Sequence, residues 1–231
     1  MNNIGFRILP IEKRLDRQLV EQFRDVVTPH ISDNLNRMHA IGSKLRPFHK
    51  EGKLIGTALT VKTRPGDNLL VHKAIDMAEP GDVIVVDAGG DTTNAIVGEI
   101  MLQLAQKKGI TGFVIDGAIR DSKAFIEGDF PVYAAGVTHR GPYKDGPGEI
   151  NVPISVGGML VHPGDLILGD EDGIAVVPQD SAAEVLEMVR IQEIKEIEIL
   201  KSIGNGTVDR SWVDEILKQK GCEFNDLANK V

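Results

Sequence analysis

The sequence predicts an α/β protein with a mixed sheet, in which βαβ units combine with a Gly- and Pro-rich antiparallel or barrel-like part. Two observations lead to this class. Continuous apolar runs such as "VIVVDAGG" and "GFVIDGA" are typical of strands buried on both faces, and a helical pattern separates them. Because strands that alternate with helices are joined by crossovers, part of the sheet is expected to be parallel.

Residues 1–50 are predicted to form a helical N-terminal segment. "LDRQLVEQFRDVV" carries apolar residues at helical spacing, and "TP" is expected to end that helix. "ISDNLNRM" then predicts a second short helix, capped by Ser32 or Asp33.

Residues 51–180 are predicted to form the α/β core. Its first elements alternate between strand and helix, and Gly109 is the expected helix stop. They are strand 55–63, a helix that carries apolar residues from Leu69 to Met77 and stops at Pro80-Gly81, strand 83–90, helix 92–108, strand 110–118 and strand 130–136. Residues 137–180 are rich in Gly and Pro, which predicts short antiparallel or barrel-like strands.

Residues 181–231 are predicted to form C-terminal helices. Ser181 and Glu184 have the spacing of a capping box, and Val185, Val189, Leu200 and Ile203 mark the expected apolar face of a long helix. Since no stretch has the composition of a flexible linker, residues 1–231 are expected to form one domain.

Composition excludes several classes of function. The net charge is -8 and no dense Lys/Arg cluster is present, which disfavours direct nucleic-acid binding. The only cysteine, Cys222, excludes an internal disulfide and a multi-cysteine metal site. The opening "MNNIGFRILP" lacks the pattern of a signal peptide and no apolar run approaches ~20 residues, so we expect a cytoplasmic protein with no membrane partner.

Arg120 and Asp121 follow a buried strand directly, where ligands of open parallel sheets gather. A guanidinium can bond both oxygens of a carboxylate, whereas a carboxylate suits a hard cation such as Mg²⁺. Gly98 indicates either close packing within helix 92–108 or a helix that begins there; in the second case the N–H groups of Ile100 and Met101 would be open to an anion. The alternative is a solvated ion pair in a surface turn.

At these residues the chain resembles the class II aldolases that cleave 4-hydroxy-4-methyl-2-oxoglutarate and 4-carboxy-4-hydroxy-2-oxoadipate, whose fold the regulator of ribonuclease activity A shares. The similarity covers nearly the whole chain, and "IDGAIRD" and "GPGEINVPISVGG" are its most specific stretches. The family motif is an acidic residue, twenty residues, Arg-Asp, two residues, then Glu or Asp. Glu99, Arg120 and Asp121 match its first three positions.

The resemblance implies a swivelling β/β/α fold and a metal-dependent pyruvate aldolase with oxaloacetate decarboxylase activity. Asp121 would bind Mg²⁺ or Mn²⁺, and Arg120 would bind the carboxylate and keto group of the substrate. Gly98 and the amides of Ile100 and Met101 would complete the carboxylate pocket. Glu99 would orient metal-bound water or assist proton transfer.

The resemblance also implies a homotrimer or a dimer of trimers, because the family takes a glutamate from the neighbouring subunit. Glu196 is the match by position, with Glu193 and Glu198 as alternatives. The last acidic position of the motif falls on Ala124. Either this acid is dispensable, or Glu127 replaces it, or the protein departs from the standard aldolase.

Three other functions compete with this one. Lys73 could form a Schiff base with a keto acid. A non-catalytic, protein-binding regulator on the same fold is the alternative from another class. A methyltransferase is disfavoured, because no Gly-rich nucleotide loop follows the first strand. His72, His139 and His162 are too scattered in sequence to predict a metal cluster.

Overall fold

The computed structural model describes residues 3–224. The chain divides into two compact units, Met1–Val189 and Arg190–Val231, and each is described by itself. The first unit contains the sheet and the candidate site. The assignment of residues 1–231 to one domain stays a prediction.

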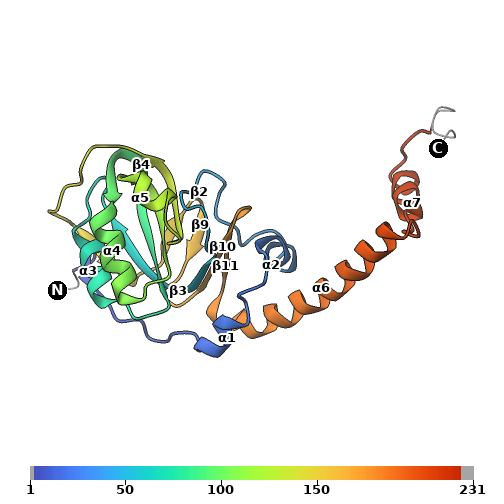
Figure 1. Ribbon diagram of the computed structural model, residues 1–231, viewed down its shortest axis with the longest axis horizontal. Coiled ribbons are helices and arrows are strands. Elements are labelled where there is room, and N and C mark those ends of the chain that lie inside the picture. The colour runs from blue at the N-terminus through green and yellow to red at the C-terminus, as the bar shows by residue number, and fades with distance from the viewer. Residues whose placement is uncertain (1–2, 225–231) are drawn as a thin grey trace. The chain divides into compact units, whose positions relative to one another are not determined.

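Four strands at the centre of the first unit run parallel to one another, as predicted (Figure 1). They are β3 (Leu54–Thr63), β4 (Asp82–Val97), β5 (Gly112–Ile119) and β6 (Val132–Val137). Their side chains alternate between two buried clusters. Ile84 and Phe113 belong to one cluster, and Val83 and Val114 to the other. Strands buried on both faces explain the continuous apolar runs of the sequence.

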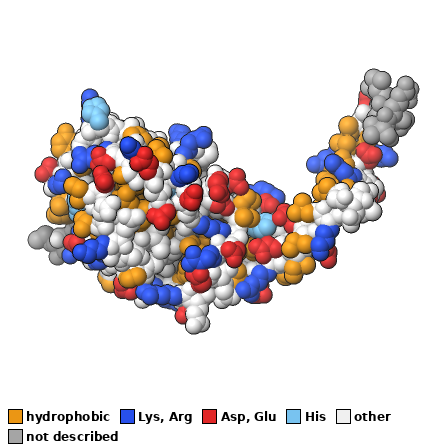
Figure 2. All heavy atoms as spheres, in the orientation of Figure 1, with side chains coloured by type: hydrophobic (Ala, Val, Ile, Leu, Met, Phe, Trp, Pro, Cys, Tyr) orange, Lys and Arg blue, Asp and Glu red, His pale blue; other side chains and the backbone are white. Residues whose placement is uncertain are grey.

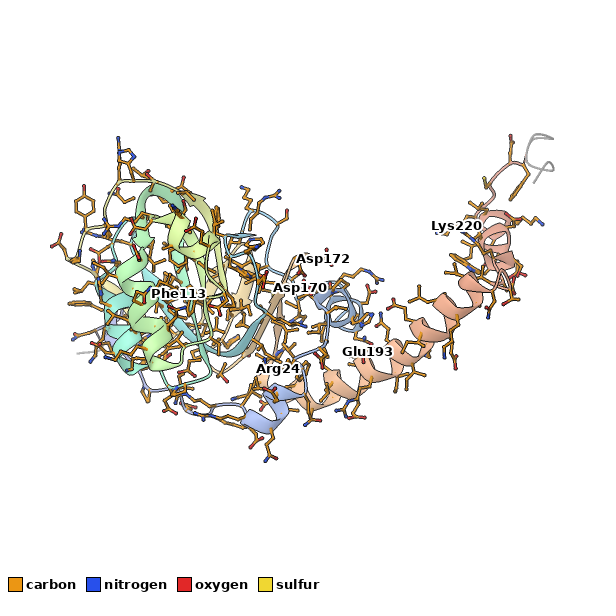
Figure 3. All side chains as sticks on the ribbon, viewed as in Figure 1. Arg24, Phe113, Asp170, Asp172, Glu193 and Lys220 are labelled. Atoms are coloured by element: carbon orange, nitrogen blue, oxygen red, sulfur yellow. The ribbon has the colours of Figure 1, made fainter. Side chains whose placement is uncertain are left out.

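Three helices supply the first cluster: α3 (Leu69–Met77), α4 (Glu99–Lys108) and α5 (Ser122–Ile126). Figure 3 shows Phe113 beneath α4, and its ring meets that of Phe130 edge-on at 5.1 Å between centroids. Gly109 ends α4 in the left-handed conformation, as predicted. These helices are the crossovers that the βαβ pattern requires.

The Gly- and Pro-rich part is largely antiparallel, which confirms the predicted mixed sheet. Short strands lie beside β3 or pack over the second cluster. The shorter strands of the unit are β1 (Phe6–Ile8), β2 (Arg46–Pro47), β7 (Gly148–Ile150), β8 (Ile154–Val156), β9 (Met159–Val161), β10 (Leu166–Asp170) and β11 (Gly173–Val177). All their pairings are antiparallel except that of β1 with β7.

The N-terminal helices differ from the prediction. The first, α1, covers only Arg17–Glu21, and Thr28-Pro29 opens α2 (Thr28–Asn34) instead of ending a helix. Proline fits the first turn of a helix, where its missing N–H needs no partner. Ser32 and Asp33 lie inside α2 and do not cap it. The N–H and hydroxyl of Thr28 bond to Asp170, which lies beside α2 in Figure 3.

The predicted helix 92–108 is too long at its start. Strand β4 continues to Val97 and α4 begins at Glu99, so the alternative in which the helix starts near Gly98 is the correct one. Gly89 and Gly90 have φ of 71° and 70°, and the register with β5 shifts between Asp87 and Asp91. Because of this irregularity, β4 does not end after its buried apolar run but continues as a strand to Val97.

A 3₁₀ turn, η1 (Gln179–Ser181), runs directly into α6 (Ala182–Gly204), so Ser181 lies within a helical turn and is not a separate N-cap. Only the first half of the predicted apolar face is buried. Val185 and Val189 pack in the core, whereas Leu200 is 62% exposed in the second unit. The second unit, which includes α7 (Ser211–Gln219), presents many exposed apolar side chains (Figure 2).

The described helices include none that is both long enough and apolar enough to span a bilayer.

Candidate active site

Arg120 and Asp121 leave the sheet at the carboxyl end of β5. The N–H of Arg120 still bonds to Val97 O at 3.0 Å, so the arginine backbone stays attached to β4. Asp121 has φ 55° and ψ 38°, a left-handed conformation that few residues other than glycine adopt. This conformation turns the chain from β5 into α5. The predicted position of the pair just beyond a core strand is therefore correct.

Gly98 lies against both side chains, which explains the glycine. A Cβ atom at this position would be 2.6 Å from Asp121 Oδ2 and 2.9 Å from Arg120 Cγ. Its φ of -150° suits any residue, so the requirement is for space and not for an unusual backbone. Asp121 Oδ2 accepts a hydrogen bond from the N–H of Glu99 at 3.1 Å. The carboxylate is thereby held at the positive end of α4.

Arg120 and Asp121 are close but half-exposed. Arg120 Nε lies 3.6 Å from Asp121 Oδ2, and the side chains are 41% and 44% exposed. A pair this open to solvent contributes little to stability. Arg120 Nη1 would lie 3.1 Å from a Cβ on Gly141, so a loop covers the guanidinium from the other side. The guanidinium is thus positioned with most of its N–H groups open to a ligand.

The two helix amides predicted to bind an anion differ from each other. The N–H of Met101 donates to Gly98 O at 3.0 Å. Among the described residues, nothing accepts from the N–H of Ile100. One open amide therefore lies next to the guanidinium at the start of α4.

A small cavity of about 120 Å³ opens between α4 and the loop that follows β6. Its lining combines one arginine, one lysine and one histidine with polar and apolar groups. These residues are Asn68, His72, Ile96, Val97, Gly98, Ile100, Met101, Arg120, Pro142 and Lys144. The volume is of the size of a small acid group, and the cations favour an anion.

Asn68 has an unsatisfied oxygen in this wall. The residue is only 3% exposed, and its Nδ2 donates to Ile96 O at 2.8 Å. Its Oδ1 is buried without a hydrogen-bond partner among the described residues. A buried acceptor left unpaired costs about 1–3 kcal/mol.

The His72 imidazole in this wall carries no charge at neutral pH. Burial, and after it the charge of Lys144, lower the pKa of the His72 imidazole, and Asp76 opposes them only in part. The imidazole is therefore neutral near pH 7. The cations of the cavity wall are thus Arg120 and Lys144.

Asp67 fixes the backbone that follows Lys144. Its Oδ2 accepts hydrogen bonds from the N–H groups of Asp145 and Gly146, at 2.8 and 2.9 Å, and its Oδ1 accepts one from Leu69. Burial alone would raise the pKa of the Asp67 carboxyl, but these N–H groups and a nearby guanidinium outweigh burial and lower it. The stabilisation is therefore present above the unfolded-state pKa and is lost as pH falls through the lowered folded-state pKa.

A second cavity, of about 430 Å³, lies on the other side of Arg120. Asp121, Lys123, Thr138 and His139 line it together with Arg120. No hydrogen bond within the described chain uses Asp121 Oδ1. The described residues contain no group of three or more His, Cys, Asp or Glu side chains arranged to hold a metal. A single open carboxylate oxygen suits a hard, mostly hydrated cation such as Mg²⁺, which binds through one or two carboxylates.

The structure brings most of the predicted site residues together. Gly98, Glu99, Ile100 and Met101 meet Arg120 and Asp121 at the start of α4. The Glu99 side chain is exposed on the outer surface of the first turn. Glu196, with Glu193 and Glu198, belongs to α6 in the second unit, and its role stays a prediction.

The last position of the motif lies in α5. Ala124 packs partly against the core within α5. Glu127 lies 3.7 Å from Lys123 in an exposed ion pair. The acid is therefore absent from α5, and the nearest carboxylate after it is bound to a lysine.

Sequence reasoning missed Asn68 and Lys144 and dismissed His72 as scattered. The signal was present, because these residues lie in "GDNLLVHK" and "GPYKDGPG", two polar stretches in the regions of resemblance. Their proximity depends on Asp67, which is distant in sequence from the loop that it binds. Lys73 is exposed on α3 and lines no part of either cavity.

The fold and the site define an α/β protein with an arginine–aspartate pair at the carboxyl ends of parallel strands, facing a helix start. A family model described as RraA-like, Aldolase/RraA, matches residues 28–176. The chain belongs to this RraA-like family.

Known relatives carry two kinds of name. A Halalkalibacterium halodurans protein named "Putative 4-hydroxy-4-methyl-2-oxoglutarate aldolase" is 46% identical over 171 residues, 74% of this chain and 81% of that protein. A Thermus thermophilus protein named 4-hydroxy-4-methyl-2-oxoglutarate aldolase is 33% identical, over 66% of this chain and 92% of its own length. The solved structure of the RNA-processing inhibitor RraA from Thermus thermophilus has a TM-score of 0.63 and 32% identity, over 67% of this chain and 94% of that one.

Proposed function

We propose that the protein is a divalent-metal-dependent aldolase that cleaves a 4-hydroxy-2-oxo acid, such as 4-hydroxy-4-methyl-2-oxoglutarate, to pyruvate and a second keto acid. The observation that carries the proposal is the contact of Gly98 with Arg120 and Asp121, which joins an anion-binding and a cation-binding side chain at one helix start. The aldolase names of relatives up to 46% identical support the same reaction class.

The substrate carboxylate fits the smaller cavity. Arg120 would bind it in a bidentate manner, with the N–H of Ile100 and the ammonium of Lys144 on its other sides. This arrangement would direct the neighbouring keto oxygen toward the guanidinium and Asp121. The larger cavity would take the rest of the substrate.

Asp121 would hold Mg²⁺ or Mn²⁺ through its open oxygen. The bound cation would polarise the keto group and stabilise negative charge on its oxygen. Arg120 would contribute to the same stabilisation, because its Nε lies 3.6 Å from Asp121 Oδ2, next to the proposed metal ligand.

Cleavage requires a base at the hydroxyl group on C4. Removal of its proton converts the hydroxyl to a carbonyl as the C3–C4 bond breaks, and the electron pair of that bond passes to the keto group as a pyruvate enolate. Protonation at C3 then gives pyruvate. Glu99, directly or through water, and Glu196 of a neighbouring subunit are the proposed groups for these proton transfers.

Oxaloacetate decarboxylation follows from the same site. Loss of CO₂ leaves the same pyruvate enolate, and Arg120 would stabilise it in the same way. We therefore expect both activities to respond alike to changes at Arg120 and Asp121.

The proposal includes a homotrimer or a dimer of trimers. A single chain supplies few acidic groups to the site, and the surface beside it is apolar: Ile100 is 71% exposed and Leu104 45% exposed on α4. A neighbouring copy that covers this surface would bring Glu196 to the site and exclude water.

A non-catalytic regulator is the second candidate. The 32% identity to the RNA-processing inhibitor RraA favours it. Ala124, at a position where the aldolase motif has an acid, is compatible with it. A direct assay separates the two functions.

The test is a lactate-dehydrogenase-coupled pyruvate assay with Mg²⁺ over a panel of 4-hydroxy-2-oxo acids and oxaloacetate. We expect pyruvate release that EDTA abolishes and that added Mg²⁺ or Mn²⁺ restores. Turnover retained in EDTA would contradict the metal requirement. No turnover on any substrate, with or without metal, would favour the regulator.

Lys144→Gln is expected to raise KM by about tenfold with a smaller change in kcat, because the lysine binds the carboxylate in the ground state and the transition state alike. Steady-state kinetics on the best substrate measure this. Lys73→Gln is the matched control, since Lys73 is an exposed lysine on α3. Loss of activity in the control, with borohydride trapping of pyruvate on Lys73, would instead support a Schiff-base aldolase.

A further inference from the structure

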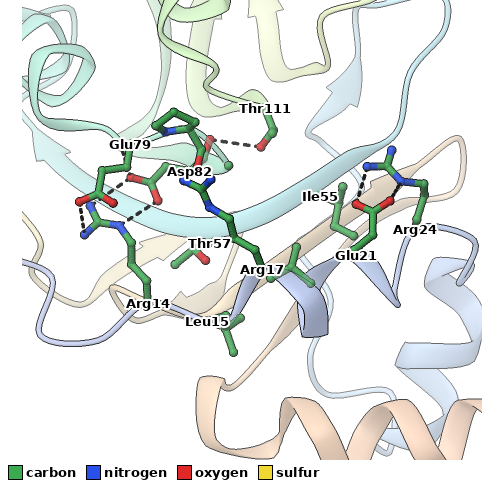
Figure 4. Close-up of a pocket in the computed structure, with 13 residues that line it drawn as sticks. Arg14, Leu15, Arg17, Glu21, Arg24, Ile55, Thr57, Glu79, Asp82 and Thr111 are labelled. Atoms are coloured by element: carbon green, nitrogen blue, oxygen red, sulfur yellow. Dashed lines mark hydrogen bonds and ion pairs between the residues drawn. The ribbon is translucent and has the colours of Figure 1, made fainter.

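A cavity outside the candidate active site lies at the opposite end of the parallel strands. It has a volume of about 400 Å³ and lies between the N-terminal segment and the starts of β4 and β5 (Figure 4). Its lining is Arg14, Leu15, Arg17, Val20, Glu21, Arg24, Ile55, Thr57, Glu79, Pro80, Gly81, Asp82 and Thr111. This volume is within the range of small-molecule sites, about 300–1,000 Å³.

Two of its three arginines are neutralised. Arg14 bonds both oxygens of the buried Asp82, each at 3.2 Å, and reaches Glu79 at 3.0 Å. Arg24 pairs with Glu21 on α1. Figure 4 shows these two ion pairs on opposite sides of the cavity. Arg24 is thus balanced by one carboxylate, and Arg14 is contacted by two.

Arg17 differs from the other two. Its Nη2 donates to Pro80 O at 3.0 Å, and no carboxylate among the described residues pairs with it. The contact with a carbonyl holds the guanidinium between the two ion pairs, as Figure 4 shows, and leaves its other N–H groups available. Arg17 is therefore the one arginine of this lining that no carboxylate contacts directly, although the three arginines and three carboxylates of the lining balance in formal charge.

The rest of the cavity is suited to an apolar body. Leu15 and Ile55 are buried in its floor, and Val20 and Pro80 contribute further hydrocarbon. The hydroxyl of Thr57 adds one hydrogen-bonding group. Three carboxylates in the same wall disfavour a phosphate dianion, because like charges repel. Cation and apolar floor together select a monoanion with a hydrophobic part.

We propose that this cavity binds a small amphipathic carboxylate, whose acid group pairs with Arg17 and whose apolar part lies on Leu15, Val20 and Ile55. The site is distinct from the candidate active site, since β4 and β5 begin at one and end at the other. The inference therefore does not depend on the aldolase proposal.

The experiment uses phenylacetate as the probe, phenylacetamide as its uncharged counterpart and inorganic phosphate as an anion that has no apolar part. Ligand-observed NMR on the full chain measures each affinity. We expect phenylacetate to bind, the other two to bind at least about tenfold more weakly, and Arg17→Gln to weaken phenylacetate by about tenfold. Val20→Phe, which narrows the cavity without removing charge, should also lower the affinity.

Arg120→Gln is the control for binding at the other site, and it should leave phenylacetate affinity unchanged. The proposal is overturned if wild-type protein binds no phenylacetate, if Arg17→Gln binds it equally well, or if Arg120→Gln abolishes binding. Phosphate binding equal to that of phenylacetate would also overturn it.

Discussion

Arg120→Lys is expected to lower kcat/KM for pyruvate formation by at least about a hundredfold, even though the positive charge remains. Lysine cannot reproduce the planar fork that bonds a carboxylate and an enolate oxygen together. Removing one such transition-state donor costs about 10²–10³ in rate. The lactate-dehydrogenase-coupled assay measures the loss, and oxaloacetate decarboxylation should fall in parallel.

Thermal unfolding separates this effect from a folding defect. Because Arg120 and Asp121 are half-exposed, the melting temperature of Arg120→Lys should stay close to that of the parent protein. Arg37→Lys is the matched control, since Arg37 forms an exposed ion pair with Asp33 within the N-terminal region. Arg120→Lys activity within threefold of the control would contradict the assigned role.

Gly98→Ala is expected to lower kcat/KM by about a hundredfold although it adds only one methyl group. The new Cβ would lie 2.6 Å from Asp121 Oδ2, so the carboxylate and the adjoining guanidinium must shift. Displacing a catalytic group by about 1 Å can cost about 10²-fold in rate. The affinity for Mg²⁺ in the activity assay should fall as well, because the shifted carboxylate is its proposed ligand.

The backbone at Gly98 accepts alanine, so stability should change little, by about 1 kcal/mol or less. Gly204→Ala is the control, because a Cβ there meets no atom within 4 Å. Full activity in Gly98→Ala would show that Asp121 and Arg120 need not occupy their present positions.

Local sequence pattern was sufficient for the parallel core. Apolar runs too long for a half-exposed strand predicted β4 and β5, and the interposed amphipathic segment predicted α4. The same pattern placed Arg120 and Asp121 just beyond a strand. It misplaced the start of α4, because "TTNAIV" fits a helix as well as a strand. This segment forms a strand because it pairs with β5 after the irregularity at Gly89 and Gly90.

The N-terminal helices show the same limit. Thr28-Pro29 is compatible with the end of one helix or the start of another, and the neighbouring residues do not distinguish these. Asp170, which is far along the chain, makes Thr28 the start of a helix, because its carboxylate accepts hydrogen bonds from the N–H and hydroxyl of Thr28. A capping group so distant in sequence leaves no local pattern.

In the candidate site, too, some residues could be predicted from the sequence and others only from the tertiary structure. Residue types and their position beyond a strand were enough to predict Arg120 and Asp121 as site residues, because a guanidinium and a carboxylate each have a preferred ligand, whereas Glu99 was predicted from the resemblance to the aldolase motif. The wall that contains Asn68 and Lys144 depends on tertiary structure. A buried carboxylate, Asp67, joins their two segments, and the resulting contacts arise only when the loop folds over α4.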